Sequence, residues 1–545
     1  YLTEGYESLI NSVEDVRVKQ GIRHLLYYLV VRELKDLHHI SSVEIVNKNH
    51  YLEMDIHTIR NLELTETLRL KERTYSLLWL LDKTKTAMGS RKIKQWLTNP
   101  LRDSNKILDR YQKIEVFNTH FMQKDEIRDL LFQVYDLERL CAKVICGNLN
   151  ARDLLQIKNS LSVLPRIKDI LRELNLEYTP NTHDELFDLL DRSIYENPPI
   201  SVKEGFLIKD GYNHELDELK SIRSGGKDFI AEFEAKLKET TGIKNLKVGF
   251  NRVFGYYIEV SKGQVENVSE AWGWERRQTL TNYERYISPE LKEKEALILN
   301  AEEKIFELEY ELFNQIRDRV KDEILEIKKT ADVISEIDAL ISLAVCSEEY
   351  NFVKPTLNTD NKIEIIEGRH PVIEKVSKEA YVPNDIIMDE ATDVLLITGP
   401  NMSGKSTYMR ELAIIIIMAQ MGSYVPAKSA NLPIIDKIFT RIGASDDLVS
   451  GESTFMVEMK EAQNALVHAT KDSLILFDEL GRGTATYDGM SLAEAILEYV
   501  AKNIKCKTLF STHYHELTQL DQEFLNVKNV HVAAKEEGNM ITFLH

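Results

Sequence analysis

The chain has 545 residues, which is too many for one hydrophobic core, so we expect several domains. Its 43% hydrophobic and 29% charged residues are ordinary for a soluble protein, and no apolar run is long enough to cross a bilayer, so no membrane association is expected. A net charge of −19 argues against a protein that binds nucleic acid over its whole surface, but it leaves room for a basic patch on one domain.

The first half of the chain is expected to be mainly helical. Apolar residues spaced along one helical face predict a helix over residues 1–38, and a mostly helical region follows to about residue 225. The pattern changes between residues 242 and 294, where the aromatic and β-branched residues of Leu246–Phe250 and Gly255–Val260 predict strands. We therefore expect a small β-containing insertion between helices.

A long helix is expected after Pro289. No Gly or Pro follows until Pro355, and apolar residues recur every three or four positions from Ile305 to Ile334. Such a helix exceeds the usual globular length, so it can be a lever, a stalk, part of a coiled coil or an ordinary long core helix. From about residue 350 strand patterns alternate with helix patterns, which predicts an α/β domain with a largely parallel sheet.

A nucleotide site is indicated by a run that fits GxxxxGK[ST], between a buried-strand pattern and a helix pattern. In such a loop the backbone N–H groups and the helix N-terminus favour phosphate. Lys405 is expected to reach the β- and γ-phosphates of ATP, and Ser406 to bind Mg²⁺. The residues expected to surround the nucleotide are Gly399, Pro400, Asn401, Met402, Ser403, Gly404, Lys405, Ser406 and Thr407.

Two further strand patterns end in residues suited to catalysis. One ends in Asp478 and Glu479, where the Asp is expected to support Mg²⁺ and the Glu to act as general base toward water. The other ends in His513, for which sensing of the γ-phosphate is favoured over a structural role. The run from Ser450 to Thr454 precedes a helix pattern, and it can either present donors to an anion or be a plain N-cap.

Together these runs resemble the ABC class of ATPases and, more narrowly, the MutS family of DNA mismatch repair proteins. The similarity in the last third rests on Thr398–Arg410, Gly422–Ala427, Asp446–Met459, Asp478–Gly489 and Thr512–Tyr514. Upstream runs resemble the core region and the clamp of the family, at residues 54–55, 60–64, 88–91, 136–139, 150–153, 210–213, 255–258, 277–280 and 284–286. The resemblance therefore covers nearly the whole chain.

The resemblance implies a multidomain fold of α and α/β parts. Residues 1–38 would be the tail of a connector domain, residues 39–241 and 295–349 core and lever helices, residues 242–294 an inserted clamp, and residues 350–545 an ABC-type P-loop ATPase domain that is incomplete at its C-terminus. The family's N-terminal mismatch-recognition domain and C-terminal helix-turn-helix have no match here, and residue 1 is not Met. We therefore expect a fragment of a longer protein.

The resemblance also implies roles and partners. Composite sites would form in a homodimer, with Ser453 acting in trans on the nucleotide of the partner and Tyr381 stacking on adenine. MutL would be a partner protein, and the location would be cytoplasmic and associated with the nucleoid. The clamp would contact the phosphates of mismatched double-stranded DNA, although each of its cations is equally consistent with ordinary surface, and these cations are Lys244, Lys247, Arg252, Lys262, Arg276 and Arg277.

The predicted function is thus ATP-dependent DNA mismatch repair, in which ATP binding and hydrolysis switch a clamp on mismatched duplex DNA and signal repair. One alternative is an ABC-type chromosome-maintenance ATPase with a coiled-coil arm and a hinge or zinc hook. The four cysteines include no CxxC pair, which disfavours that hook and favours reduced thiols in a cytosolic protein. A second alternative is a DNA-binding scaffold without turnover.

Overall fold

The computed structural model describes residues 7–11, 13–33, 43, 50–202, 204–251, 255–378, 380–400, 403–442, 454–537 and 540–544. The chain divides into two compact units, and each is treated by itself. The first unit comprises residues 1–132, 167–179 and 331–545, and the second comprises residues 133–166 and 180–330. Among the described residues, no helix is both long enough and apolar enough to span a bilayer.

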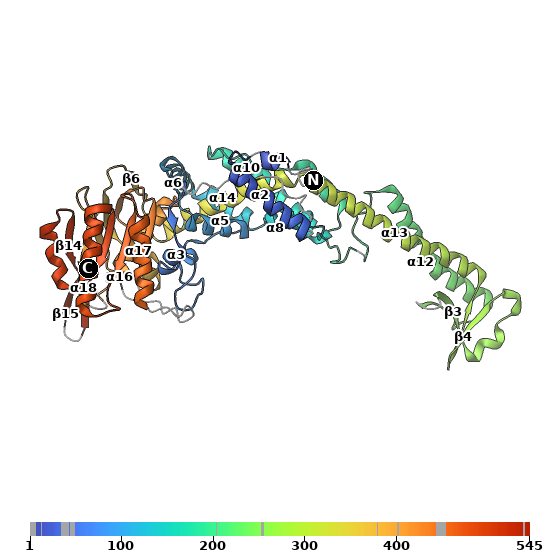
Figure 1. Ribbon diagram of the computed structural model, residues 1–545. Helices are drawn as coiled ribbons and strands as arrows, with labels where there is room; N and C mark the ends of the chain where they lie inside the picture. The colour runs from blue at the N-terminus through green and yellow to red at the C-terminus, as the bar shows by residue number, and fades with distance from the viewer. Residues whose placement is uncertain are drawn as a thin grey trace. The chain divides into compact units, whose positions relative to one another are not determined.

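A six-stranded sheet, parallel throughout, forms the centre of the first unit, and Figure 1 draws most of it in orange and red. Its inner strands are continuous apolar runs that are buried on both faces, as parallel sheets require. This confirms the parallel sheet predicted for the end of the chain. In order across the sheet the strands are β1 (Glu53–Met54), β11 (Lys437–Arg441), β12 (Leu474–Asp478), β13 (Lys507–Ser511), β9 (Val394–Thr398) and β14 (Val527–His531).

Helices cover this sheet, and two smaller β structures accompany it. Helix α16 (Lys405–Gln420) contacts β12 and β13, while α17 (Thr454–His468) and α18 (Thr486–Tyr499) share a hydrophobic core with β9, β12 and β13. The other elements are a mixed sheet of β6 (Thr356–Asn358), β10 (Ser429–Pro433), β7 (Ile363–Gly368) and β8 (Asn384–Met388), a hairpin of β15 (Ala533–Glu537) and β16 (Met540–Leu544), and the short helices α15 (Pro371–Val376), η5 (Val500–Ile504), η6 (His515–Gln519) and α19 (Leu520–Glu523).

The N-terminal part of the first unit is helical, with one departure from prediction. The single helix expected over residues 1–38 is wrong, because Asp15 interrupts it. The Asp15 side chain accepts the backbone N–H of Arg17 at 2.7 Å and so starts a new helix. The helices of this part are α1 (Glu7–Asn11), α2 (Val16–Tyr27), η1 (Tyr28–Arg32), α3 (Ile56–Asn61), α4 (Leu77–Leu81), α5 (Ala87–Thr98), α6 (Ser104–Thr119) and α7 (Phe121–Leu131).

The second unit combines helices with an antiparallel sheet. Helices α12 (His214–Thr241) and α13 (Pro289–Asp322) lie side by side and flank the sheet in sequence (Figure 1). The strands predicted between residues 242 and 294 are therefore present, although α13 already begins at Pro289. The strands of this sheet, in order, are β2 (Lys247–Asn251), β3 (Gly255–Ser261), β5 (Tyr283–Ile287) and β4 (Glu275–Thr279), with η3 (Lys262–Asn267) and η4 (Glu270–Trp272), and the remaining helices are α8 (Leu137–Ile145), α9 (Ala151–Ser162) and α11 (Asp184–Ser193).

The long helix expected after Pro289 is two helices. Helix α13 ends at Asp322 and α14 (Ile324–Glu349) follows, because Glu323 leaves helical geometry with φ −95° and ψ 2°. The Glu323 carboxylate lies 2.9 Å from Nδ1 of the buried His183. The periodicity of apolar residues continues through this break, so the sequence pattern could not reveal the break. Helix α14, like α10 (Leu164–Glu173), has residues in both units.

Candidate active site

The loop with the GxxxxGK[ST] pattern joins β9 to α16, so the strand and the helix expected on its two sides are both present. Gly404, at φ 92°, precedes α16, whose first turn carries the lysine and serine of the pattern. Gly399 packs so closely against Val532 that a Cβ atom on this glycine would lie 3.0 Å from the Val532 carbonyl oxygen. Ser403 Oγ is buried without a hydrogen-bond partner among the described residues. The loop is therefore tightly folded and holds one unsatisfied hydroxyl.

Lys405 is buried and bends back over its own loop. Its Nζ atom donates hydrogen bonds to the carbonyl oxygens of Gly399 at 2.8 Å and Pro400 at 3.2 Å, and it lies 4.0 Å from Glu479 Oε1. Burial lowers the pKa of Lys405, while the charges of Glu479 and Asp478 act in the opposite direction. The ammonium group is thus held where a phosphate on this loop would need a cation.

The Asp478 carboxylate, at the end of β12, accepts a hydrogen bond on each of its oxygens. Ser406 Oγ from α16 donates to Asp478 Oδ2 at 2.6 Å, and Ser511 Oγ from β13 donates to Asp478 Oδ1. Asp478 and Ser511 are paired in the parallel register of the two strands. The two residues predicted to bind metal, Ser406 and Asp478, therefore lie together and offer the oxygen ligands that Mg²⁺ prefers. No sequence pattern indicated Ser511, because only strand register places it here.

Glu479 lies in a strained turn directly after β12. Its φ of 53° is in the left-handed region, which costs a non-glycine residue about 1 kcal/mol. The Glu479 N–H donates to the carbonyl and the hydroxyl oxygen of Ser511, both at 3.1 Å. His513 Nε2 lies 2.6 Å from one carboxylate oxygen and Arg482 Nη1 lies 2.6 Å from the other. Arg482 lies within the run Asp478–Gly489 that resembles the family, but the sequence analysis predicted no role for it.

The surroundings of Glu479 keep its carboxylate ionised. Burial raises the pKa of Glu479, but the hydrogen bond to His513 and the positive charges around the carboxylate lower that pKa more. A carboxylate that is ionised and held in a fixed orientation can accept a proton from a neighbouring water molecule. The two residues predicted to be catalytic, Glu479 and His513, are in contact with each other.

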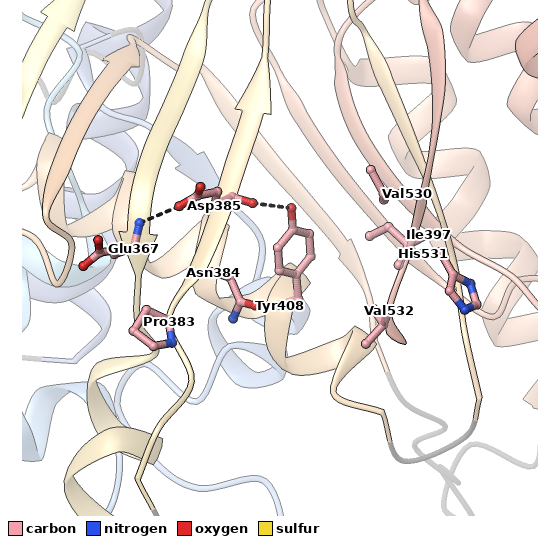
Figure 2. Close-up of a pocket in the computed structure, with 9 residues that line it drawn as sticks. All are labelled: Glu367, Pro383, Asn384, Asp385, Ile397, Tyr408, Val530, His531 and Val532. Carbon is pink, nitrogen blue, oxygen red and sulfur yellow. Dashed lines mark hydrogen bonds between the residues drawn. The ribbon is translucent and has the colours of Figure 1, made fainter. Parts of the chain in front are cut away.

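A cavity of about 430 Å³ lies beside the loop (Figure 2). Its wall includes Ile397 from β9 and Tyr408 from α16, the two elements that the loop joins. The Tyr408 hydroxyl donates to the Asp385 carbonyl oxygen at 3.1 Å, and Figure 2 shows Val530 and Val532 across the cavity from Tyr408. A cavity with polar and apolar walls in this place suits the base or sugar of a nucleotide. The lining residues are Glu367, Pro383, Asn384, Asp385, Ile397, Tyr408, Val530, His531 and Val532.

Tyr381, which was predicted to stack on adenine, is hydrogen-bonded to the buried carboxyl group of Glu411. Its hydroxyl donates to Glu411 Oε2 at 2.7 Å, and Asn384 Nδ2 lies 3.4 Å from the same oxygen. Glu411 is fully buried in α16, and burial raises its pKa to about 7. The ring of Tyr381 is thereby tied to the helix that carries the phosphate-binding residues, and the neighbouring Asn384 lines the cavity.

Raising the pH through 7 is expected to destabilise this unit. The pKa of Glu411 in the folded protein, about 7, lies above its ordinary value of 4.5, so the folded chain binds more protons between these values. The resulting stability is fully present below pH 4.5 and is lost as the pH rises through about 7, by about 3 kcal/mol in total. Glu411→Gln should remove this loss, which urea unfolding at several pH values between 4.5 and 8 would measure. Glu390→Gln, at an exposed site, is the control, and equal pH dependence in all three proteins would contradict the expectation.

The structure places three of the six predicted DNA-contacting cations on the sheet of the second unit. Lys247 lies on β2, while Arg276 and Arg277 lie on β4. The two arginines have acidic neighbours, since Arg276 lies 3.4 Å from Glu284 and Arg277 lies 3.5 Å from Glu275. Lys244 is exposed just before β2 and Lys262 just after β3, so both lie at the open end of this antiparallel hairpin. Four predicted site residues lie outside the described part of the chain, namely Arg252, Asn401, Met402 and Ser453.

Two tryptophans just before β4 pack locally. The Trp272 and Trp274 ring centroids lie 5.1 Å apart, and Trp274 lies 6.0 Å from Tyr286. Both tryptophans cover a small core that includes Phe233, Ile258 and Tyr286. These contacts make local packing the role that the structure supports for both tryptophans.

The chain matches two protein-family models, MutS domain III over residues 57–344 and MutS domain V over residues 395–545. It is 54% identical over 551 residues to the DNA mismatch repair protein MutS of Geobacillus sp. (strain WCH70), a match that covers 100% of this chain and 64% of the relative. The corresponding proteins of Bacillus cytotoxicus and Bacillus cereus (strain G9842) are 54% and 52% identical over 551 residues, again covering 100% of this chain, and 62% of each relative.

The chain therefore spans 62–64% of the length of these relatives. The two family models fall on the helical part and on the α/β part, in the order that the sequence predicted. Both the family models and the relatives favour this family over the chromosome-maintenance ATPase that the sequence left as an alternative.

Proposed function

The chain belongs to the MutS family of DNA mismatch repair proteins, and from this premise we propose that it binds ATP at the loop after β9 and hydrolyses it with Glu479 as general base. One observation carries the proposal. A buried lysine, a pair of oxygen ligands and an ionised carboxylate converge where β9, β12 and β13 end, at the carboxyl edge of a parallel sheet. This site would switch a clamp on mismatched duplex DNA and signal repair.

The residues at the site fit ATP with Mg²⁺. Ser403 Oγ is a buried hydroxyl without a partner among the described residues, and a phosphate oxygen would satisfy it. Ser406 and Asp478 would hold Mg²⁺, which would neutralise charge on the phosphates. Glu479 takes a proton from the attacking water, and His513, which is bonded to that carboxylate, would sense the γ-phosphate. Arg482 holds the second oxygen of Glu479.

Further features of the nucleotide site follow from the family. The base would occupy the cavity of Figure 2. Tyr381, which shares the acceptor Glu411 with the lining residue Asn384, would stack on adenine. Two chains would form composite sites in a homodimer, in which Ser453 acts on the nucleotide of the partner. Signalling to MutL and a cytoplasmic location associated with the nucleoid belong to the same proposal.

The proposed domains follow the sequence boundaries. Residues 1–38 would be a connector tail, residues 39–241 and 295–349 core and lever, residues 242–294 the clamp, and residues 350–545 the ATPase domain. A clamp role for residues 242–294 is supported by their exposed lysines and by the sheet that lies between α12 and α13 in the sequence. In addition, β1 at Glu53–Met54 pairs with β11, so a strand from the core segment joins the ATPase sheet.

The test of the proposed function is ATP turnover by the purified chain, measured with and without duplex DNA that contains a mismatch. Turnover that DNA stimulates would support an ATPase coupled to a clamp. Nucleotide binding without turnover would instead favour the scaffold without hydrolysis. Sedimentation with and without ATP, in the same samples, would show whether two chains associate to build the composite site.

Replacing three clamp lysines with glutamine is expected to weaken binding to duplex DNA without changing its sequence preference. Each lost phosphate contact should reduce the slope of log affinity against log salt concentration by about 0.9 in magnitude. In the triple variant of Lys244, Lys247 and Lys262 the slope should therefore be smaller by up to about 3. Fluorescence anisotropy at several salt concentrations would measure this slope. A matched triple variant at the exposed residues Lys321, Lys378 and Lys471 is the control. Equal slopes in the two variants would refute a clamp role for these lysines.

A further inference from the structure

The turn that follows the proposed general base contains two left-handed residues within three positions. Glu479 has φ 53° and Gly481 has φ 89°. A Cβ atom on Gly481 would lie 2.5 Å from the Gly489 carbonyl oxygen, so two stretches of backbone touch at this point. Residues in sparsely populated conformations keep them only when surrounding groups hold them in place. The orientation of the Glu479 carboxylate thus depends on the groups that hold this turn in place.

Both polar groups of Gly481 are held by side chains from elsewhere in the chain. Glu458, from the second turn of α17, is 4% exposed, and its Oε1 accepts the Gly481 N–H at 2.6 Å. Tyr514, which follows β13, donates its hydroxyl to the Gly481 carbonyl oxygen at 3.1 Å. A hydrogen bond to a carboxylate is about twice as strong as one between neutral groups. Glu458 is therefore the stronger of the two supports.

We infer that Glu458 and Tyr514 are positioning residues for Glu479, an inference that rests on the proposed hydrolysis. They fix the backbone two residues after the base, while Ser511 fixes the N–H of the base itself. The turn is thus held at both ends, and the carboxylate between them faces His513 and Arg482. Without the support of Glu458, the turn relaxes and the carboxylate moves away from the water that it activates.

The test compares Glu458→Leu, which removes the acceptor, with Glu458→Gln, which keeps an oxygen at the same place. A displacement of about 1 Å at a catalytic group can cost about 100-fold in rate, so Glu458→Leu should lower kcat by about 10- to 100-fold, with ATP affinity changed by less than about 3-fold. Glu458→Gln should restore kcat to within about 3-fold of the unmodified chain, since a neutral acceptor forms a weaker bond. A purely structural role would lower thermal stability and leave kcat unchanged, and that result would overturn the inference.

Tyr514→Phe is the milder variant, which serves if Glu458→Leu does not fold. Loss of one neutral hydrogen bond, worth about 1 kcal/mol, should lower kcat by about 5-fold. Tyr499→Phe, at an exposed tyrosine at the end of α18, is the matched control and should leave kcat unchanged. Equal kcat values for the two phenylalanine variants would count against the positioning role of Tyr514.

Hydrogen exchange at residues 479–483 separates failure of this inference from failure of the proposed function. Absence of turnover in the unmodified chain would reject the proposed function, and exchange would then decide the inference alone. The Gly481 amide should be protected, should lose protection in Glu458→Leu, and should regain it in Glu458→Gln. Unchanged exchange in Glu458→Leu would overturn the inference, whether or not the chain hydrolyses ATP.

Discussion

Replacing Glu479 with glutamine is expected to reduce ATP turnover by about 100-fold or more, because general base catalysis contributes about 10²- to 10⁴-fold. Glutamine has nearly the same shape and still offers one oxygen to His513 or Arg482, but its neutral amide cannot accept a proton from water. Since Lys405, Ser406 and Asp478 are untouched, ATP affinity should change little. Single-turnover hydrolysis and titration with a fluorescent ATP analogue would measure the two quantities separately.

The behaviour with pH gives an independent check on Glu479. Its pKa is held below the ordinary value by His513 and the nearby cations, so the carboxylate remains ionised throughout the neutral range. Turnover should therefore not decline through protonation of Glu479 as the pH falls from 8 to 6. Glu390→Gln, at an exposed position of the same unit, should behave like the unmodified chain.

Turnover above about one tenth of normal in Glu479→Gln would point to another base.

The parts of the fold that the sequence predicts well are those in which local pattern decides. The inner strands of the parallel sheet are buried on both faces, so they are uninterrupted apolar runs such as Val394–Thr398 and Leu474–Asp478. Polar residues directly after such runs lie at one edge of the sheet, whatever the order of the strands. For this reason the pattern of residues was enough to group Asp478, Glu479 and His513 with the loop.

What the sequence could not predict depends on contacts between distant segments. Ser511 reaches Asp478 only through the register of two strands, and β1 joins a sheet whose other strands lie more than 300 residues further along the chain. Arg482 contacts Glu479 because the turn after β12 is left-handed, a conformation that is unusual for a glutamate. The helix break at Glu323 preserves the apolar periodicity, so no pattern marks it.

Replacing Lys405 with methionine is expected to weaken ATP binding by about 10- to 100-fold, the equivalent of one charged hydrogen bond of about 1.5–3 kcal/mol. Methionine keeps the length and the apolar stem of lysine, so the buried site stays filled, but no cation remains for the phosphates. Two carboxylates, Asp478 and Glu479, would then face the bound phosphates without the ammonium group that now lies 4.0 Å from Glu479. Turnover should fall with affinity, in contrast to Glu479→Gln.

Lys507 provides a matched control for this substitution. It is also buried, burial also lowers its pKa, and its Nζ donates to the carbonyl oxygens of Asp389 and Thr392 at 2.9 and 2.6 Å. Lys507 is the first residue of β13, so it lies at the amino ends of the parallel strands, whereas the nucleotide site lies at their carboxyl ends. Lys507→Met should therefore lower the unfolding temperature and leave ATP affinity unchanged. If Lys405→Met instead bound ATP as tightly as Lys507→Met does, the loop after β9 would not hold the phosphates.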